Sequence, residues 1–572
     1  MPILCKAAKN GSETMVKMLL EHGADVNVAD KQGNTALHLS TSNAVSETLL
    51  NAGANINGVV AQLLDCKADC GLTTKECKKY PLMIACEREF ANIAMMLLDR
   101  GADANVSEDT ETPLKLAAAN GDAVLVKRLL ADGADVNTMR NISDTALHVA
   151  VERCRGLCNK AFVNIVQILL KSGADPNALN HRAETPLFLA YRPTNSHLNI
   201  DIVQLLLEHG ADPNTCPARV RACPTGLNSS AWSPNIALPP LKYATICNNS
   251  ELAMLLIKFG ASVDQSDDRG RTALHFAVSH MGYVRGMESE QWNALVQLVQ
   301  LLLDRGASVN LASEDGETPF YIACSMGLRS IAEKMLENGA KVDGNSAVML
   351  PLIAACTYER VSVVELLLTI GANPNVRREQ SIENRYLCSL HIATAAGNAE
   401  LVKLLLKHDA HADIADINGN TALHHAVKPI REPWSLRNGV ASKLIMDILL
   451  ENKADVNKVN NFGETPLYRA VSEGLLDVVN DMLLVYGGNA NRGSPDKSHL
   501  VAAFEKLISN RRYQSTEGKR IKLSAIRLLL EHGASFDTPT PDGLSVMHHF
   551  AGAIRTSVGL ERVLSFQLHN KI

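Results

Sequence analysis

Apolar residues recur through the chain at three- and four-residue intervals, and each pair of apolar runs is followed by a short polar segment. In the stretch 111–137, for example, ETPLKLAAANGD is followed by AVLVKRLLADGADVN. This spacing predicts two short helices that each bury one face, with a polar hairpin after the second. A chain made of such pairs has the pattern of an all-α protein.

The sequence repeats itself with a fixed period. The segment LLEHGADVN at 19–27 returns with small changes at 97–105, 129–137, 169–177, 206–214, 302–310, 367–375, 449–457 and 529–537. A second segment, of the type ETPLKLA at Glu111, precedes most of these copies in the same phase. The glycines are 32 residues apart from Gly101 to Gly133 and 33 apart from Gly306 to Gly339. Periods of this length indicate a stack of similar helical units.

Each motif contains residues suited to the ends of helices. The threonine of Thr112-Pro113 can cap a first helix through its hydroxyl, and the proline needs no N–H at that position. The glycine that follows the paired leucines, such as Gly133, suits the left-handed backbone that ends a second helix. The motifs therefore predict where both helices of a unit begin and end.

Together the two motifs resemble those of the ankyrin-repeat family. The resemblance covers nearly the whole chain and implies an all-α ankyrin solenoid of roughly fourteen helix-turn-helix units with hairpins, several with loop inserts. We expect residues 1–572 to form one continuous array, with irregular units near 58–80 and 215–240. Residues 541–572 carry only part of the pattern, which predicts a partial repeat or a C-terminal cap.

Several units contain extra residues between their two helices. These inserts lie at 153–161, 192–199, 280–293, 428–441 and 510–520. The three tryptophans all lie in inserted segments: Trp232, Trp292 and Trp434. Exposed aromatic side chains are common binding anchors, so the tryptophans are candidates for contact with a partner. The alternative is that each ring covers the flank of its own repeat.

The composition argues against several classes of function. Lys and Arg number 56 against 61 for Asp and Glu, so the net charge of −5 offers no basic surface to nucleic acid. The N-terminus lacks a secretion signal, and no apolar run reaches the ~20 residues that span a bilayer. The 13 cysteines are irregularly spaced, which is typical of reduced thiols. We expect a cytoplasmic or nuclear protein that neither binds nucleic acid nor inserts into membranes.

No arrangement of residues favours catalysis or a cofactor. Histidine fills the fourth place of the first-helix motif in several units, where the resemblance implies hydrogen bonds to neighbouring backbone: His38, His148, His275, His391 and His424. Four cysteines of one irregular unit lack the Cys-x-x-Cys spacing of a zinc site: Cys66, Cys70, Cys77 and Cys86. Phosphate-binding loops and nucleophile motifs are also missing. We predict that the protein is not an enzyme and uses no metal, cofactor or small-molecule substrate.

The hairpin tips differ from unit to unit, as a surface that recognises proteins requires. The resemblance implies that partners bind these tips and the adjoining first helices, which line a concave surface. The contact candidates are Lys31, Gln32, His181, Arg182, Asp267, Asp268, Arg269, Glu314, Asp315, Asn418, Asn461 and Phe462. We predict a monomeric, non-catalytic scaffold or adaptor. Two other classes stay open: the recognition arm of a larger protein, such as a ubiquitin-ligase substrate receptor, channel or kinase, and an effector or toxin-like array.

The resemblance also implies a modification. Hairpins that end in Asp-Val-Asn, with a leucine eight positions before the asparagine, resemble the substrates of an oxygen-dependent asparaginyl hydroxylase that acts on many ankyrin proteins. Asn27, Asn137 and Asn457 match this pattern. The alternative is that these asparagines only satisfy backbone groups of their own hairpins.

Overall fold

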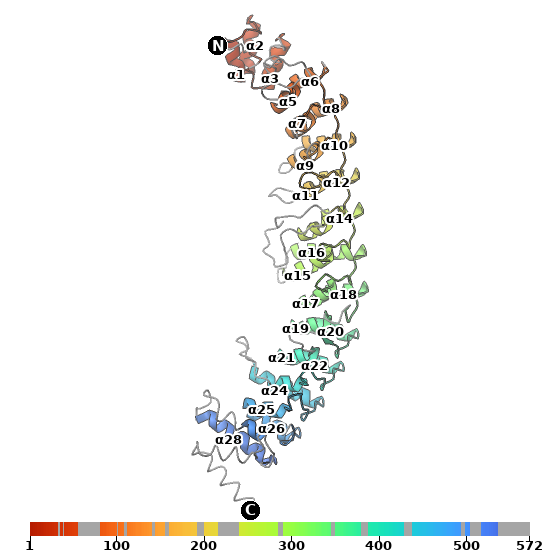
Figure 1. The fold of residues 1–572 in the computed structure, drawn as a ribbon, viewed down its shortest axis with the longest axis vertical. Coiled ribbons are helices and arrows are strands. Elements are labelled where there is room, and N and C mark those ends of the chain that lie inside the picture. Colours follow the sequence, from red (N-terminus) through yellow and green to blue (C-terminus); the bar gives the residue numbers. More distant parts are fainter. Residues whose placement is uncertain are drawn as a thin grey trace, which may run out of the picture. The chain divides into compact units, whose positions relative to one another are not determined.

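The computed structural model of the protein describes residues 1–31, 35–37, 39–54, 80–99, 101–107, 111–139, 143–154, 160–191, 199–215, 239–283, 290–344, 349–378, 387–427, 438–493, 498–503 and 516–535. These residues form short helices in pairs that are joined by hairpins (Figure 1). The chain divides into two compact units, Met1–Asp268 with Asn293–Leu302 and Arg269–Trp292 with Leu303–Ile572. The predicted all-α repeat fold is confirmed.

The helices of the first unit are α1 (Ile3–Lys9), α2 (Glu13–Glu21), α3 (Asn43–Asn51), α5 (Pro81–Glu87), α6 (Ala91–Asp99), α7 (Pro113–Asn120), α8 (Ala123–Ala131), α9 (Ala146–Arg153), α10 (Lys160–Lys171), α11 (Pro186–Tyr191), α12 (Ile200–Glu208), α13 (Pro240–Ile246) and α14 (Ser250–Lys258). Helix α16 (Glu290–Asp304) contributes residues to both units.

The helices of the second unit are α15 (Ala273–Tyr283), α17 (Pro319–Met326), α18 (Arg329–Glu337), α19 (Pro351–Thr357), α20 (Val361–Thr369), α21 (Ser389–Ala395), α22 (Ala399–Lys407), α23 (Ala422–Ala426), α24 (Asn438–Glu451), α25 (Pro466–Glu473), α26 (Leu476–Leu484) and α28 (Thr516–Glu531). Two short strands, β1 (Arg377–Arg378) and β2 (Leu387–Cys388), pair antiparallel in one hairpin.

The helix ends follow the predicted chemistry. Thr112 caps α7, because its hydroxyl accepts the Lys115 N–H at 3.2 Å, and Pro113 is the first helical residue. Thr318 and Thr465 cap α17 and α25 in the same way. Gly133 has a φ of +87°, the left-handed conformation that a side chain disfavours. These local signals therefore set the helix boundaries of a typical unit.

The second repeat differs from this pattern. Its motif, NTALHLS from Asn34, predicts a first helix, but residues 35–37 and 39 form turns, with an isolated bridge between Ala29 and Thr35. Ser40 stands where other units have a small apolar residue. Its hydroxyl donates to the Ser42 carbonyl at 3.1 Å and lies 2.9 Å from the Ser46 hydroxyl, while the Leu39 N–H donates to the Thr35 carbonyl at 3.3 Å, as in a single helical turn.

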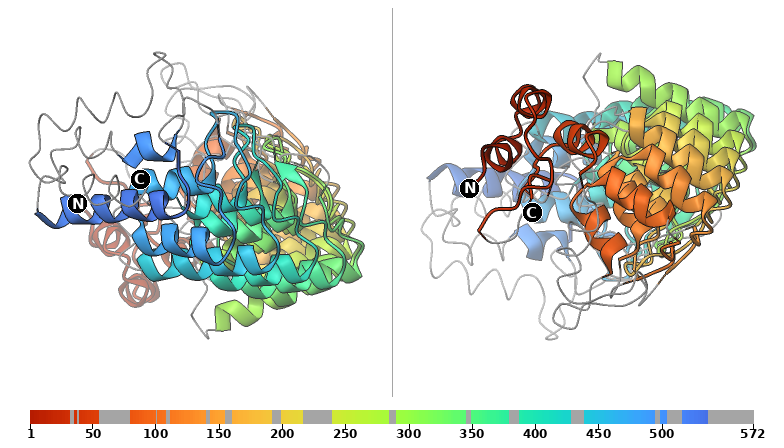
Figure 2. Two further views of the ribbon diagram at one scale, coloured as in Figure 1. Left: turned by 90° about the horizontal axis from the view of Figure 1, so that it is seen from below. Right: turned by 90° about the horizontal axis from the view of Figure 1, so that it is seen from above.

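The core lies between two layers of helices in each unit. First helices pack against first helices, as α7 does against α9 and α17 against α19, and second helices pack likewise, as α8 does against α10 and α20 against α22 (Figures 1 and 2). The leucines that end the second helices are fully buried, as at Leu129, Leu169, Leu405 and Leu449. Each repeat therefore buries its apolar faces against its neighbours.

The inserts between first and second helices coincide with longer second helices. Helices α10, α16, α24 and α28 contain 12, 15, 14 and 16 residues, whereas α8 and α22 contain 9. Part of the inserts at 153–161, 280–293, 428–441 and 510–520 therefore extends the second helix toward its N-terminus, whereas α12, which follows the insert at 192–199, keeps 9 residues.

Several predicted segments lie outside the described residues. They are nearly all of the irregular segments 58–80 and 215–240, and the whole of 541–572. The prediction that 1–572 forms one continuous array stays a prediction.

Candidate functional site

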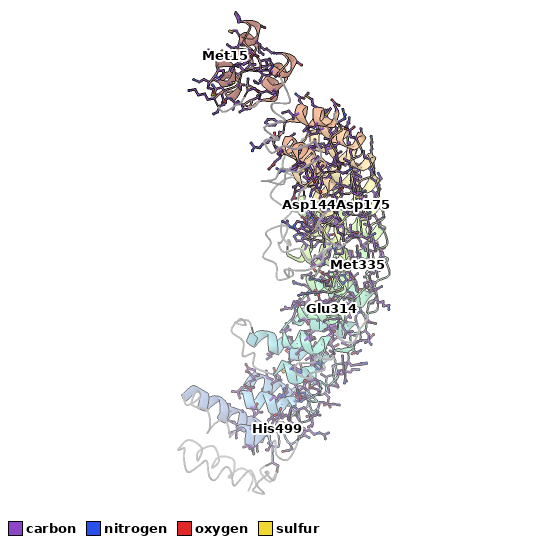
Figure 3. All side chains as sticks on the ribbon, turned by 45° about the horizontal axis from the view of Figure 1, so that its top comes forward. Met15, Asp144, Asp175, Glu314, Met335 and His499 are labelled. Atoms are coloured by element: carbon purple, nitrogen blue, oxygen red, sulfur yellow. The ribbon has the colours of Figure 1, made fainter. Side chains whose placement is uncertain are left out.

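In most of the described hairpins an asparagine binds the next hairpin. The Nδ2 group donates to a backbone carbonyl of the following hairpin at 2.8–3.2 Å, and Oδ1 accepts a backbone N–H two residues further on at 2.7–3.0 Å. In the described part of the chain, these asparagines are Asn105, Asn137, Asn177, Asn214, Asn310, Asn375, Asn457 and Asn491. Asp175, labelled in Figure 3, supplies the N–H that Asn137 accepts. The asparagine row fixes the spacing of consecutive hairpin backbones.

Among the described residues, aspartate replaces this asparagine at Asp264, Asp343 and Asp413, and at Asp343 and Asp413 it makes half of the connection. Asp343 Oδ1 accepts the Asn373 N–H at 3.1 Å, and Asp413 Oδ1 accepts the Asp455 N–H at 2.9 Å. A carboxylate has no N–H to donate to the neighbouring carbonyl. The connection between consecutive hairpins is therefore weaker at Asp343 and Asp413, where one hydrogen bond replaces two.

The fourth residue of the first-helix motif makes a second connection between repeats. His148 Nε2 lies 3.0 Å from the Glu184 carbonyl oxygen, and its Nδ1 lies 2.8 Å from the Thr145 hydroxyl. A carbonyl can only accept, so Nε2 carries the proton. His275, His391 and His424 contact the carbonyls of Glu317, Ile414 and Glu464 in the same way. These four histidines therefore have the structural role that the resemblance implied.

Lysine fills the same place in two units, which the sequence reasoning missed. Lys115 Nζ donates to the Ser143 hydroxyl at 3.1 Å, and Lys242 Nζ pairs with the carboxylate of Asp267. Both side chains of the second pair are fully buried. The signal was available, because Lys115 and Lys242 follow a proline and a leucine in the register of the histidines.

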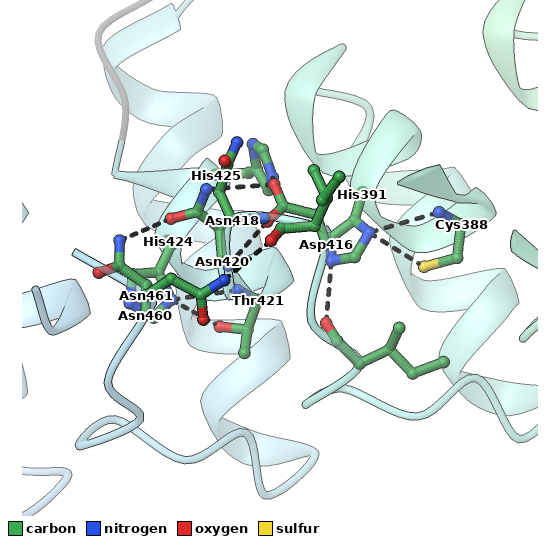
Figure 4. A network of polar contacts seen from close by, with 12 residues as sticks. Cys388, His391, Asp416, Asn418, Asn420, Thr421, His424, His425, Asn460 and Asn461 are labelled. Atoms are coloured by element: carbon green, nitrogen blue, oxygen red, sulfur yellow. Dashed lines mark hydrogen bonds and ion pairs between the residues drawn. The ribbon is translucent and has the colours of Figure 1, made fainter. Parts of the chain in front are cut away.

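A buried polar residue closes the tip loop in three of the described hairpins. Asp416 Oδ1 accepts the backbone N–H groups of Asn418 and Asn420, both at 2.8 Å, while the Asp416 N–H donates to the Asn420 carbonyl (Figure 4). Asn180 and Asn460 close their loops identically. The tip backbone is thus held by a side chain that points inward, which leaves the intervening side chains free to differ.

Asp416 is also the centre of a larger network. Its Oδ2 accepts from Asn420 Nδ2 at 3.1 Å and lies 3.0 Å from His425 Nε2 (Figure 4). Burial alone would raise the pKa of Asp416, but hydrogen bonds from His425 and Asn420 outweigh it and hold the pKa well below its usual range. The carboxylate is therefore ionised and structural.

Two pairs of tips are bonded directly to each other. The Glu314 N–H donates to the Arg269 carbonyl at 2.9 Å, and the Asn461 N–H donates to the Asn418 carbonyl at 2.9 Å. A Cβ on Gly419 would lie 2.6 Å from the Asn461 backbone nitrogen, so the second approach requires glycine. Neighbouring tips therefore present their side chains in fixed relative positions.

The structure exposes most of the predicted contact residues. The exposed ones are Lys31, His181, Arg182, Asp268, Arg269, Glu314, Asp315, Asn461 and Phe462. Glu314 is labelled in Figure 3. Asn418 and Trp292 are partly exposed, whereas Gln32, Trp232 and Trp434 lie outside the described residues. Asp267 differs from the prediction, because its carboxylate is fully buried in the pair with Lys242 and cannot contact a partner in this conformation.

The three candidate hydroxylation sites lie in the asparagine row or at its start. Asn137 and Asn457 each make both connections to the next hairpin, and the Asn27 N–H donates to Asp25 Oδ1 at 2.9 Å. Asn27 and Asn137 are exposed. The side chains of Asn137 and Asn457 thus bind the backbone of the next hairpin, which differs from the alternative that they bind only their own hairpins, and hydroxylation stays a prediction.

The titratable groups of the described residues are arranged for packing. Burial lowers the pKa of His424 and of His499 to about 4, and it raises the pKa of the Cys86 and Cys356 thiols to about 12. Among the described residues, no group of three or more His, Cys, Asp or Glu side chains is placed to hold a metal ion. No described helix is both long enough and apolar enough to cross a membrane.

Comparison with protein families identifies the repeat. The family model described as ankyrin repeats (3 copies) matches residues 1–59, 54–140, 125–216, 287–378 and 379–431. The models described as ankyrin repeats (many copies) and ankyrin repeat match 442–483 and 418–461.

The chain is also similar to parts of several longer proteins. It is 25% identical over 466 residues to human transient receptor potential cation channel subfamily A member 1, an alignment that covers 73% of this chain and 34% of the channel. It is 26% identical over 277 residues to the mouse B-cell lymphoma 3 protein homolog, covering 46% of this chain and 50% of that protein. Variola virus ankyrin repeat protein OPG189 is 28% identical over 291 residues, covering 49% and 46%. The chain therefore spans a third to a half of the length of these relatives.

Proposed function

The chain belongs to the ankyrin-repeat family, and from this premise we propose that it is a non-catalytic scaffold or adaptor that binds partner proteins through its hairpin tips and the adjoining first helices. Repeats of this family are protein-interaction modules and are typically not catalytic. The tip side chains would contact the partner, and the buried residues beneath them would hold the tip backbone in place.

One observation supports the proposal above others. Inward-pointing side chains hold the tip backbones, as Asp416 does, while outward-pointing side chains differ from tip to tip, as Asp268, Glu314 and Phe462 do. A rigid backbone lowers the entropy lost on binding, because the contact groups are already in place. Variable side chains on such a frame supply specificity.

The test compares partners in cells by proximity labelling and pull-down with purified 1–572. The tip variant carries Asp268→Ala, Glu314→Ala, Asp315→Ala and Phe462→Ala, all at exposed positions. We expect it to lose the partners of the wild-type chain while keeping the wild-type circular dichroism spectrum and melting curve.

A matched control removes the same chemistry from second helices. It carries Val124→Ala, Asp201→Ala, Glu251→Ala and Glu400→Ala, which are one exposed apolar and three exposed acidic residues. Partners retained in full by the tip variant, or lost equally by both variants, would overturn the proposal.

A second candidate is the recognition arm of a larger protein. It is favoured by the channel relative, in which the aligned region is 34% of the chain. An antibody against residues 1–31 tests this on the natural protein. A band well above 61.8 kDa supports the second candidate, and a band at that mass rejects it.

A further inference from the structure

The tip loop at 313–317 lacks a side-chain bond that three other tips have. In those tips an inward-pointing Asp or Asn accepts the backbone N–H groups two and four residues further on: Asn180, Asp416 and Asn460. Ser313 stands at the equivalent position and is 8% exposed. Among the described residues, its buried hydroxyl has no hydrogen-bond partner. The N–H groups of Asp315 and Glu317 therefore lack the side-chain acceptor that holds the other tips, which we call the clamp.

Side-chain length explains the difference. In Asp and Asn the accepting oxygen lies two bonds beyond Cβ, whereas the serine oxygen lies one bond beyond it. The shorter Ser313 side chain leaves its oxygen without a bond to either N–H group. A buried polar group without a partner costs free energy, so conformations that expose this hydroxyl to water are favoured in comparison.

The loop 460–464 is a matched comparison for this tip. Each loop is closed by a 2.9 Å bond from its first N–H to its fifth carbonyl, and by a bond of 2.9 or 3.0 Å from its glycine N–H, Gly316 or Gly463, to its first carbonyl. In each loop the second N–H also donates to the preceding tip at 2.9 Å, and a histidine Nε2 contacts the fifth carbonyl at 3.0 or 3.1 Å. The two loops therefore share their backbone bonds, and the loop with Ser313 lacks the clamp.

Bonds on both sides of the loop would confine an opening to it. Asn310 Nδ2 joins its hairpin to the next one by donating to the Gly339 carbonyl at 2.8 Å. Thr318 caps α17 by accepting the Tyr321 N–H at 3.1 Å. Neither bond involves residues 313–317, so the loop can open while the asparagine row and the helix stay intact.

We propose that the loop 313–317 is an adjustable tip, which opens locally in the free chain while the clamped tips stay closed. The missing clamp removes two hydrogen bonds from the closed form, which should make its open form roughly tenfold more populated than that of loop 460–464. Glu314, labelled in Figure 3, and Asp315 are exposed and move with the loop. The tip therefore presents them in more than one position, a role in binding that rests on the proposed function.

The test is hydrogen exchange of the full chain without a partner, resolved to single amides by mass spectrometry. The Gly316 and Gly463 amides make equivalent bonds, so their protection factors report the opening of the two loops. We expect Gly316 to exchange roughly tenfold faster than Gly463. Loop 460–464 has one further bond to the preceding tip, from Asn461 Nδ2 to the Ile417 carbonyl at 2.8 Å, so substitutions are needed to separate its effect from that of the clamp.

Substitutions of Ser313 isolate the clamp. Ser313→Asn supplies an acceptor and should slow Gly316 exchange by roughly tenfold. Ser313→Ala is the matched control, because it removes the hydroxyl without supplying an acceptor, and it should slow Gly316 exchange far less. The reverse substitution, Asn460→Ser, removes a clamp and should speed Gly463 exchange by roughly tenfold.

Three outcomes overturn the proposal. They are equal protection of Gly316 and Gly463 in the wild type, an unchanged Gly316 rate in Ser313→Asn, and a slowing in Ser313→Ala as large as that in Ser313→Asn. No partner is present in these measurements, so their failure is distinguishable from failure of the proposed function, which is read from partner capture.

The role of the opening in binding is tested in the partner-capture assay. Ser313→Asn fixes the tip in one position and should lose part of the partners of the wild-type chain. Capture of the same partners in the same amounts would overturn that role.

Discussion

The buried pair of Lys242 and Asp267 offers the sharpest test of how consecutive repeats are held together. Both side chains are fully buried, and the lysine of α13 reaches the hairpin of the next repeat. Replacing Lys242 with Met keeps much of the side-chain volume but leaves the Asp267 carboxylate buried without its cation. Breaking a buried pair in this way costs about 3–5 kcal/mol. We expect Lys242→Met to lower the free energy of unfolding by an amount in this range.

The double variant Lys242→Met/Asp267→Asn should recover most of that loss. Asparagine is the natural residue at the equivalent tip positions, Asn180 and Asn460, where its Oδ1 closes the loop. It needs no counter-ion, and methionine suits the apolar surroundings of α13. The double variant should therefore lie within about 1–2 kcal/mol of the wild type, since replacing both members of a buried pair is often nearly neutral.

The assay is urea unfolding of the full chain, followed by circular dichroism and by hydrogen exchange of the α13 and α14 amides. Hydrogen exchange shows whether the loss of stability occurs in α13 and α14. This localisation is needed because repeat proteins can unfold in segments. The matched control is Lys115→Met, because the Lys115 Nζ donates to the Ser143 hydroxyl and its paired carboxylate, Glu111 at 3.8 Å, is half exposed rather than buried. A loss below about 1 kcal/mol in Lys242→Met, or a double variant as unstable as the single one, would refute the reasoning.

Three further outcomes are expected. Lys453 ends its helix with a φ of +66°, so Lys453→Gly should raise the free energy of unfolding by about 0.5–1 kcal/mol in the same urea assay, and a decrease would contradict this. Burial lowers the pKa of His424 to about 4, so the unfolded chain binds more protons below pH 6.5. The contribution of this histidine to stability is complete above that pH and should fall by about 2 kcal/mol from pH 7 to pH 5, and His424→Gln should reduce the pH dependence of stability by that amount. Co-expression with the asparaginyl hydroxylase should add one oxygen atom to the peptide that contains Asn137, and an unchanged mass in mass spectrometry would remove that hypothesis.

The sequence predicts those features that depend on local chemistry. Thr112 caps a helix and Gly133 ends one because each effect involves only a few neighbouring residues. The role of His148 also follows from its register, since the same place in every unit faces the next hairpin. Repetition thus makes long-range contacts predictable wherever the repeat is regular.

The prediction fails where a residue's environment depends on a partner in the next repeat. Asp267 belongs to a polar tip and was expected at the surface, but the lysine 25 positions earlier draws it into the interior.

The asparagine row also has a mechanical consequence. Each asparagine amide shares load between two hairpins through two bonds in parallel, whereas Asp343 and Asp413 carry the load through one. Under tension along the second unit, the hairpin row would yield first at Asp343, because the hairpins joined at Asp413 are also bonded through Asn461 to Asn418 and Ile417, and the segments on either side would extend as blocks. Single substitutions at these positions thus set where a stretched repeat array opens.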